Sequence, residues 1–149
     1  MMLLYDKLYL SPNFLEISVK IYLPSLLDEI IKIFSNRDSV LLEQNIEDFV
    51  LDAKRLQPLG IIINELLTNI MKYAFKDIPT GKITVSAYLK NNIASFIVED
   101  NGVGFSDLDN SEKQSGFGLM LVNLLTKQLK GNLQIERTNG ARITLQFKI

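Results

Sequence analysis

The sequence predicts a single α+β domain in which helices cover one face of a largely antiparallel sheet. Three observations support this class. The first half of the chain contains stretches with the apolar spacing of amphipathic helices, the second half contains two pairs of strands joined by short turns, and a further helical stretch separates those pairs. The 149 residues are 47% hydrophobic, which is enough apolar material for one core but not for two ordinary domains.

Composition excludes several classes of function. The 16 Lys and Arg residues nearly balance the 17 Asp and Glu residues, and a net charge of −1 argues against a nucleic-acid partner. There is no Cys, so disulfides and thiolate metal sites are excluded, and no His, so the usual general base and metal ligand are missing. No stretch has the length and apolarity of a membrane span or a secretory signal, which indicates a soluble, cytoplasmic chain.

The N-terminal half predicts a strand, a helix and further short strands. Residues 14–23 alternate and are rich in β-branched and aromatic residues, which favours a strand. Pro24 then opens a helical stretch for which Asn36 is the expected stop. The stretch 39–51 has the pattern of one or two short strands, and Pro58 leads into the next helix.

The helix that contains "NELLTNIMKYAF" (64–75) has two different faces. Glu65, Asn69, Lys72 and Tyr73 fall within an arc of roughly 100° of an ideal helix, because successive residues advance by about 100°. The opposite face is apolar and suited to a core; it comprises Leu66, Leu67, Ile70, Met71 and Ala74. Taken alone, the polar stripe is more often a solvated surface than a site.

The C-terminal half predicts two hairpins. Strands at 82–89 and 93–100 are joined by Asn91-Asn92, and strands at 132–138 and 141–149 are joined by Asn139-Gly140, pairs that tolerate the left-handed angles of tight turns. Between the hairpins lies a helix at 116–131 with Gly131 as its stop. Its apolar face carries Leu119, Val122, Leu125 and Leu129, and both Met71 and Met120 are expected to fill the core.

Three stretches together suggest nucleotide chemistry. Asp100, at a strand end, can accept a hydrogen bond from an exocyclic amine such as that of adenine. Gly102 and Gly104 permit close backbone approach to a planar ligand. Gly116 and Gly118, expected to precede a helix that runs from residue 118, would leave free N–H groups at its positive end for phosphate oxygens. Asn69 offers an oxygen of the kind that Mg²⁺ accepts.

The order NELLTNIMKYA, DNGVGF and GFGLMLV resembles the N, G1 and G2 boxes of the GHKL ATPases, the group of gyrase, MutL, chaperone and histidine-kinase ATP domains, over residues 56–149. Within that group, the short stretch 106–115 and the run "GLMLVNLLTKQLKG" are most similar to histidine kinases with a dimerisation domain of the second HisKA type. The resemblance implies the Bergerat ATP-binding fold, a two-layer α/β sandwich with a mixed, largely antiparallel sheet.

Matched by position, the resemblance also implies roles for individual residues. Asn69 would coordinate Mg²⁺ and Asp100 would bind the adenine amine of ATP. Lys72 would lie near the phosphates and Tyr73 near the base, while Glu65 occupies the acidic position that polarises a water in hydrolysing members. The remaining residues implied for the nucleotide pocket are Gly102, Gly104, Lys113, Gly116, Gly118 and Leu119, with Lys113 reaching for the γ-phosphate.

The implied function is the ATP-binding catalytic domain of a sensor histidine kinase, which moves the γ-phosphoryl of Mg-ATP to a His on a separate dimerisation domain of the same protein. Its partners would be that domain and a response regulator, in a homodimer of the full-length protein, whether or not that protein is attached to a membrane. Residues 1–11 are similar to the end of the last dimerisation helix, and 12–149 would form the ATPase domain. The alternatives are an anti-sigma-type serine kinase and a nucleotide-responsive binding module without chemistry.

Overall fold

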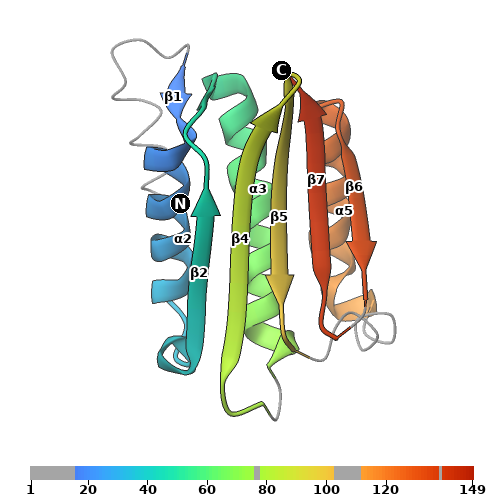
Figure 1. The fold of residues 1–149 in the computed structure, drawn as a ribbon. Coiled ribbons are helices and arrows are strands. Elements are labelled where there is room, and N and C mark those ends of the chain that lie inside the picture. Colours follow the sequence, from blue (N-terminus) through green and yellow to red (C-terminus); the bar gives the residue numbers. More distant parts are fainter. Residues whose placement is uncertain (1–15, 76–77, 103–111, 138) are drawn as a thin grey trace.

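The protein is a two-layer sandwich with a five-stranded sheet on one side and three helices on the other (Figure 1). The computed structural model describes residues 16–75, 78–102, 112–137 and 139–149. The helices are α2 (Val19–Lys32), α3 (Ala53–Asn69) and α5 (Glu112–Gln128). A short 3₁₀ helix, η1, spans Arg37–Ser39, and a π-helical turn, η2 (Ile70–Ala74), continues α3.

The main sheet has the order β2-β4-β5-β7-β6. Its strands are β2 (Val40–Ile46), β4 (Gly81–Lys90), β5 (Ile93–Asp100), β6 (Asn132–Glu136) and β7 (Arg142–Lys148). β2 runs parallel to β4 and every other neighbouring pair is antiparallel, so the predicted mixed, largely antiparallel sheet is confirmed. A separate two-stranded sheet pairs β1 (Ile17–Ser18) with β3 (Val50–Leu51).

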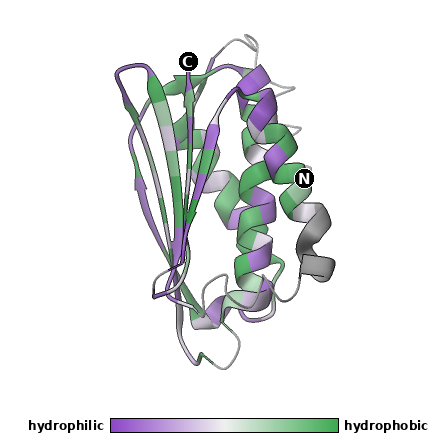
Figure 2. Cartoon of the chain, turned by 90° about the vertical axis from the view of Figure 1, so that its right-hand side faces the viewer, coloured by the Kyte–Doolittle hydropathy of each residue, from purple (hydrophilic) through white to green (hydrophobic). Residues whose placement is uncertain are grey.

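The core lies between the sheet and the helices. On the sheet, alternate residues of the central strands point to the helices and are buried, as Ile83, Val85 and Ala87 of β4 show. The apolar face predicted for the two-faced helix is buried too, since all five of its members are less than 9% exposed. Figure 2 shows the sheet and the helices from the side, as two layers. This packing fixes α3 against the middle of the sheet.

Both predicted hairpins are confirmed. Asn91 and Asn92 have φ angles of 53° and 63°, and they join β4 to β5. Asn139 and Gly140, with φ angles of 51° and 106°, lie in the connection between β6 and β7. Left-handed pairs of this kind match the twist of the flanking strands, so the local sequence is sufficient to specify them.

The predicted strand at 14–23 is wrong. Among the described residues of that stretch only Ile17 and Ser18 are extended, and α2 begins at Val19 with Pro24 inside it. The helix buries Val19, Tyr22, Leu23 and Leu26, whose spacing fits a helix as well as the alternation fits a strand. Burial of this face outweighs the backbone hydrogen bond that Pro24 cannot donate.

Four helix boundaries also differ from prediction. α2 ends at Lys32 rather than at Asn36, and α3 begins at Ala53, so that Pro58 lies inside the helix and does not precede it. α5 begins at Glu112, ahead of the predicted start at residue 116, and ends at Gln128. The one or two strands expected at 39–51 are confirmed as β2 and β3.

The predicted apolar face of α5 is confirmed in part. Val122, Leu125 and Leu129 are buried and Leu119 is half-buried. Met120 is not a core residue, because its side chain is 67% exposed, whereas Met71 is buried as expected. The predicted dimerisation-helix segment at 1–11 lies outside the described residues. No helix in the described part of the chain is long and apolar enough to cross a membrane.

Candidate nucleotide-binding site

The elements that carry the candidate residues meet at one end of the sandwich. Figure 1 shows the end of β5, the end of α3 and the start of α5 at the lower end of the molecule. The strand therefore delivers Asp100, and the two helices deliver Glu65, Asn69 and Gly118. The sequence intervals between them are long, so only the fold brings them together.

Asp100 is a buried carboxylate at the tip of β5. It is 8% exposed, and its Oδ1 accepts a hydrogen bond of 2.8 Å from the N–H of Gly102. Its own N–H donates to the carbonyl of Ala141 at 3.0 Å. Burial raises the pKa of Asp100, and hydrogen bonds from the backbone of Gly102 and Ala141 partly offset that rise. The side chain is thus a fixed acceptor in a poorly solvated position.

Two glycines hold the turn that carries Asp100. A Cβ on Gly102 would lie 2.1 Å from the carbonyl oxygen of Ala74, so only glycine lets this turn pack against the end of η2. A Cβ on Gly140 would lie 2.0 Å from the carbonyl oxygen of Asp100, and the φ of 106° at Gly140 independently favours glycine. The hairpin that joins β6 to β7 therefore packs against the backbone of Asp100 as well as extending the sheet.

Glu65 and Asn69 lie together beneath α5. A Cβ on Gly118 would be 2.9 Å from Oε2 of Glu65 and 4.0 Å from Nδ2 of Asn69. Any larger residue at position 118 would displace the Glu65 carboxylate. The structure therefore places Glu65, Asn69 and Gly118 in one small region, as their predicted roles require.

The amide of Asn69 is unusual because it is buried without a partner. The side chain is 8% exposed, and its Nδ2 makes no hydrogen bond, the only such atom among the buried side chains of the described residues. A buried unpaired amide costs about 1–3 kcal/mol, so its persistence calls for a reason. The oxygen and nitrogen of an amide are assigned from their surroundings, and a 180° flip would present the oxygen instead.

This arrangement fits a magnesium ion. An amide oxygen from Asn69 beside the Glu65 carboxylate supplies hard oxygen donors, and Mg²⁺ typically takes only one or two protein ligands together with phosphate and water. Within the described residues no group of three or more Asp, Glu, His or Cys side chains gathers to hold a metal. Metal binding here would therefore depend on the phosphates of a bound nucleotide.

Lys72 and Tyr73 lie on the π-helical turn that follows Asn69. Lys72 is exposed and Tyr73 is half-buried. The widened turn frees the carbonyl of Met71, which accepts a hydrogen bond of 3.2 Å from Nδ2 of Asn36. Such turns recur at functional sites, where they redirect the side chains that follow. The regular helix assumed from the sequence is thus replaced by a local widening at the stripe itself.

The glycines at 116 and 118 do not precede the helix. Both lie inside α5, which begins at Glu112, so their N–H groups are not among the four free donors of its first turn. The predicted phosphate cradle from these two amides is therefore not formed in this structure. Leu119 follows Gly118 and is half-buried. Gly104 and the side chain of Lys113 lie outside what the structure describes.

Two residues of the site were not predicted from the sequence. Gly140 was interpreted only as a hairpin residue, and Asn36 only as a helix stop. Their contacts with Asp100 and Met71 join segments 40 and 35 residues apart along the chain. No local pattern signals such contacts.

Comparison with known proteins, like the geometry of the site, indicates a nucleotide-binding domain. Residues 55–149 match the family described as histidine kinase-, DNA gyrase B- and HSP90-like ATPase. A Rickettsia conorii protein named "Putative sensor histidine kinase NtrY-like" is 30% identical over an alignment that covers 93% of this chain and 25% of that protein. The anti-sigma F factor of Shouchella clausii is 28% identical over 52% of this chain and 60% of that protein.

The fold comparison points to the same group. The histidine kinase domain of the blue-light activated histidine kinase EL346 from Erythrobacter litoralis superposes with a TM-score of 0.85 at 20% identity, over 98% of this chain and 70% of that one. The protein belongs to the histidine kinase-, DNA gyrase B- and HSP90-like ATPase family. It spans about a quarter of the length of the Rickettsia relative.

Proposed function

We propose that this domain binds Mg-ATP and transfers its γ-phosphoryl group to a histidine on a separate dimerisation domain of the same protein. The buried, unpaired amide of Asn69 beside Glu65 is the observation that carries this proposal. An amide held in that state at a cost in stability is explained by a ligand that pairs with it. A response regulator would then take the phosphoryl group from the histidine.

Different residues of the site bind different parts of Mg-ATP. Asp100 accepts a hydrogen bond from the adenine amine, and Tyr73 packs near the base. Asn69 ligates the metal, Lys72 offers its charge to the phosphates, and Glu65 orients a metal-bound or attacking group. Mg-ATP supplies the phosphoryl group and the charge that offsets its negative oxygens, so the protein contributes mainly positioning and electrostatics.

The six other residues assigned to the pocket support these roles. Gly102 and Gly118 leave the space that side chains would fill. Gly104 follows Asp100 in the sequence, whereas Lys113 and Gly116 lie in the first turns of α5, and we assign all three to the phosphate side of the pocket. Leu119 lies next to Gly118 and lines the same region.

An exposed apolar face on α5 supports a partner domain close to the site. Met120 and Leu124 are 67% and 63% exposed and lie one helical turn apart on the helix that carries Gly118. Exposed apolar neighbours at this spacing are typical of a helix that docks against another helix. A dimerisation domain bound there would hold its histidine near the phosphate end of the pocket.

The test measures phosphoryl transfer. The chain has no His, so incubation with γ-³²P-labelled Mg-ATP should leave no acid-labile phosphate on it, because phosphohistidine needs an imidazole nitrogen. Addition of the dimerisation domain of the full-length protein should produce an acid-labile, alkali-stable phosphate on that domain. Binding of Mg-ATP without any transfer to it would refute the kinase proposal.

The similarity to an anti-sigma F factor keeps one alternative open. A serine kinase on the same fold would place an acid-stable phosphate on a serine of a protein substrate. Mass spectrometry after acid treatment separates the two outcomes, since phosphoserine survives and phosphohistidine does not. A nucleotide-responsive module without chemistry would bind Mg-ATP and label neither.

Further proposals concern the protein as a whole. We place the end of a dimerisation helix at residues 1–11 and the ATPase domain at 12–149, in a homodimer built by the dimerisation domain. A domain that uses ATP and a response regulator would work in the cytoplasm, whether or not the full protein is attached to a membrane.

A further inference from the structure

We propose that the end of the domain opposite the nucleotide site binds an acidic peptide segment of a protein. A groove of about 820 Å³ lies there between the start of α3, the end of α5 and the end of β7. This volume is within the range of roughly 300–1,000 Å³ that is typical of ligand pockets. The lining residues are Asp52, Lys54, Arg55, Gln57, Gln128, Leu129, Lys130, Lys148 and Ile149.

The groove is strongly basic although the chain is not. Its lining side chains comprise four cations (Lys54, Arg55, Lys130 and Lys148) and one carboxylate, which gives a balance of +3. The whole chain carries −1, so the remaining side chains sum to −4. Including the α-carboxylate of Ile149 still leaves the groove at +2. Positive charge is thus gathered at this end, where it would attract an anionic partner.

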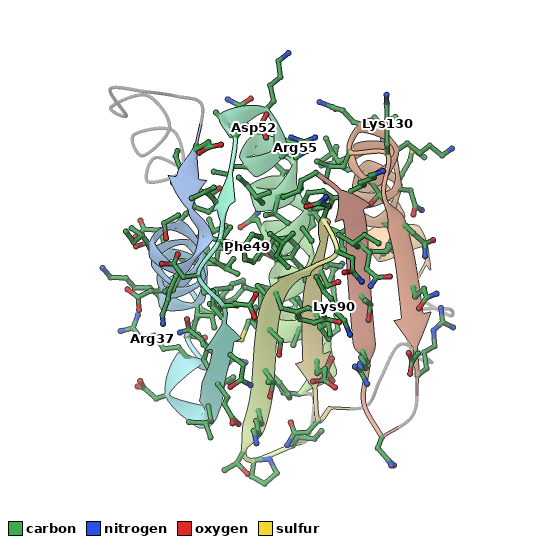
Figure 3. The ribbon with its side chains drawn as sticks, turned by 45° about the horizontal axis from the view of Figure 1, so that its top comes forward. Arg37, Phe49, Asp52, Arg55, Lys90 and Lys130 are labelled. Atoms are coloured by element: carbon green, nitrogen blue, oxygen red, sulfur yellow. The ribbon has the colours of Figure 1, made fainter. Side chains whose placement is uncertain are left out.

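The start of α3 adds to this field. The carboxylate of Asp52, at the N-cap, makes no capping hydrogen bond and instead pairs with the guanidinium of Arg55 at 3.0 Å. The first-turn amides are therefore not capped by the side chain that usually does so. The positive end of the helix dipole points to the same groove as the lysines. Figure 3 shows Asp52, Arg55 and Lys130 at this end of the molecule.

Lys130 is held in a conformation that costs energy. Its φ is 56°, in the left-handed region where glycine is favoured, and it lies at the position that follows the α5 cap. A lysine there is strained, because its Cβ approaches the following carbonyl oxygen in left-handed backbone. Strain retained at a binding surface is explained if the side chain serves the ligand. In the groove, that side chain is one of the four cations.

The chemistry of the lining favours a peptide over other anions. The cations come from three elements, so they suit a ligand with several carboxylates spaced along a chain rather than one small ion. The amide side chains of Gln57 and Gln128 can pair with a peptide backbone, and Leu129 and Ile149 offer apolar contact between the charges.

The groove and the nucleotide site are separate. α3 and α5 have 17 residues each and run between the two ends, which places the sites about 25 Å apart. The peptide should therefore bind without competing with ATP. The proposal does not depend on phosphoryl transfer and stands even if the domain lacks kinase activity.

The experiment is fluorescence anisotropy with the 149-residue chain. The probe is a fluorescein-labelled, end-capped hexapeptide of four glutamates and two leucines, and the control peptide has glutamine at each glutamate position. Replacement of Lys54 and Lys148 by Gln together should weaken binding of the acidic peptide about tenfold, because each exposed contact contributes a factor of about two to five. Binding should also weaken as salt is raised.

Matched variants separate a groove from general charge attraction. Lys20→Gln, which removes an exposed charge on α2, should change the affinity by less than twofold. Lys130→Gly should weaken binding about two- to fivefold while making the fold more stable, a combination that structural damage cannot produce. Saturating Mg-ATP should leave the anisotropy unchanged.

Several outcomes would overturn the proposal. These are equal affinity for the two peptides, no measurable binding of the acidic one at 1 mM, equal weakening by Lys20→Gln, and displacement by Mg-ATP. Stronger competition by tripolyphosphate, by single-stranded DNA or by vesicles of anionic lipid than by unlabelled peptide would assign the groove to another class of anion.

Discussion

At the scale of single residues, the buried carboxyl of Asp100 affects the stability of the fold in a way that depends on pH. Its folded-state pKa is raised above the ordinary value of 3.8, so between those two pH values the folded protein binds more protons than the unfolded chain. The stability contributed by the protonated acid is lost as the pH rises through this window. At neutral pH the ionised, buried carboxylate is therefore a net cost, which a bound adenine would offset.

We predict that Asp100→Asn weakens ATP binding at least tenfold without lowering the melting temperature. The substitution removes the buried charge, which is why the fold should not be destabilised. The amide can present a donor to the adenine amine in place of the carboxylate acceptor. The hydrogen bond lost is one to a charged group, which contributes about 1.5–3 kcal/mol. Calorimetric titration with ATP and GTP, together with thermal melting, measures both effects. Unchanged ATP affinity in a folded variant would disprove the role of Asp100 in base recognition.

For the wild-type protein the same carboxyl predicts a pH dependence. ATP affinity should fall as the pH is lowered through the raised pKa of Asp100, at a higher pH than an ordinary carboxyl would require. ATP titrations at a series of acidic pH values, in the range where the protein stays folded, would measure this loss of affinity. The Asp100→Asn variant is the control, and its ATP affinity should not show this pH dependence.

A second residue-scale prediction concerns Asn69. Asn69→Ala should abolish most of the Mg²⁺-dependent part of nucleotide affinity and little of the metal-free part, while stability is kept because an unpaired buried amide is removed. Lys72→Ala is the matched comparison. It should weaken ATP but not adenosine, since its charge acts on phosphate alone. Equal losses for Asn69→Ala with and without Mg²⁺ would rule out the metal role.

At the scale of elements, local signals predict the two hairpins better than the helix ends. Asn91-Asn92 and Asn139-Gly140 specify their turns through angles that few other residues adopt, so neighbouring residues contain the information. Pro24 and Pro58 were interpreted as helix starts, yet each is the sixth residue of its helix. The burial of apolar residues before each proline determines where each helix begins, and that burial depends on partners distant in sequence.

The end of α5 yields an element-scale prediction. Gly131 donates its N–H to Thr126 and Lys130 donates to Lys127, a pattern whose left-handed position is usually glycine. Here Lys130 occupies that position with a φ of 56°. Lys130→Gly should raise the free energy of unfolding by about 0.5–1 kcal/mol, because relief of the strain exceeds the entropy that glycine loses. Urea titration measures the change.

The neighbouring glycine is the control for that prediction. Gly131→Ala should destabilise the protein by about 1–3 kcal/mol, since its Cβ would lie 2.7 Å from the carbonyl oxygen of Gln146. The sequence predicts Gly131 as the stop of a helix that in fact ends at Gln128, and packing against β7, not backbone angle, demands glycine at position 131. Stabilisation by both substitutions would contradict this distinction.

At the scale of the whole molecule, the candidate site was predicted as a set of residues but not as an arrangement. The spacing of Glu65 and Asn69 on one helix is a local property and was visible in the sequence. The approach of Gly118 to both side chains, and of Gly140 to Asp100, depends on how α5 and the second hairpin pack on the sheet. The exposed Met120 shows the same limit, since residue type alone placed it in the core.

That exposed face leads to the last prediction, which concerns the docking of the domain on its partner. Met120→Gln and Leu124→Gln together should leave folding and Mg-ATP affinity unchanged, because both side chains already face solvent. Transfer to the histidine-bearing domain, added as a separate protein, should fall at least tenfold in its second-order rate. Burial of each side chain in a helix interface contributes about 1.5–3 kcal/mol when complete.

The matched control for this pair is Ile33→Gln, a similar loss of apolar surface at the end of α2, where the side chain is 77% exposed. It should leave the rate of transfer unchanged. When the two domains are joined by their natural linker the effect of the α5 variants should shrink, because tethering supplies a high effective concentration and docking energy then matters less. Wild-type transfer rates for the double variant as a separate domain would show that the partner does not dock on Met120 and Leu124.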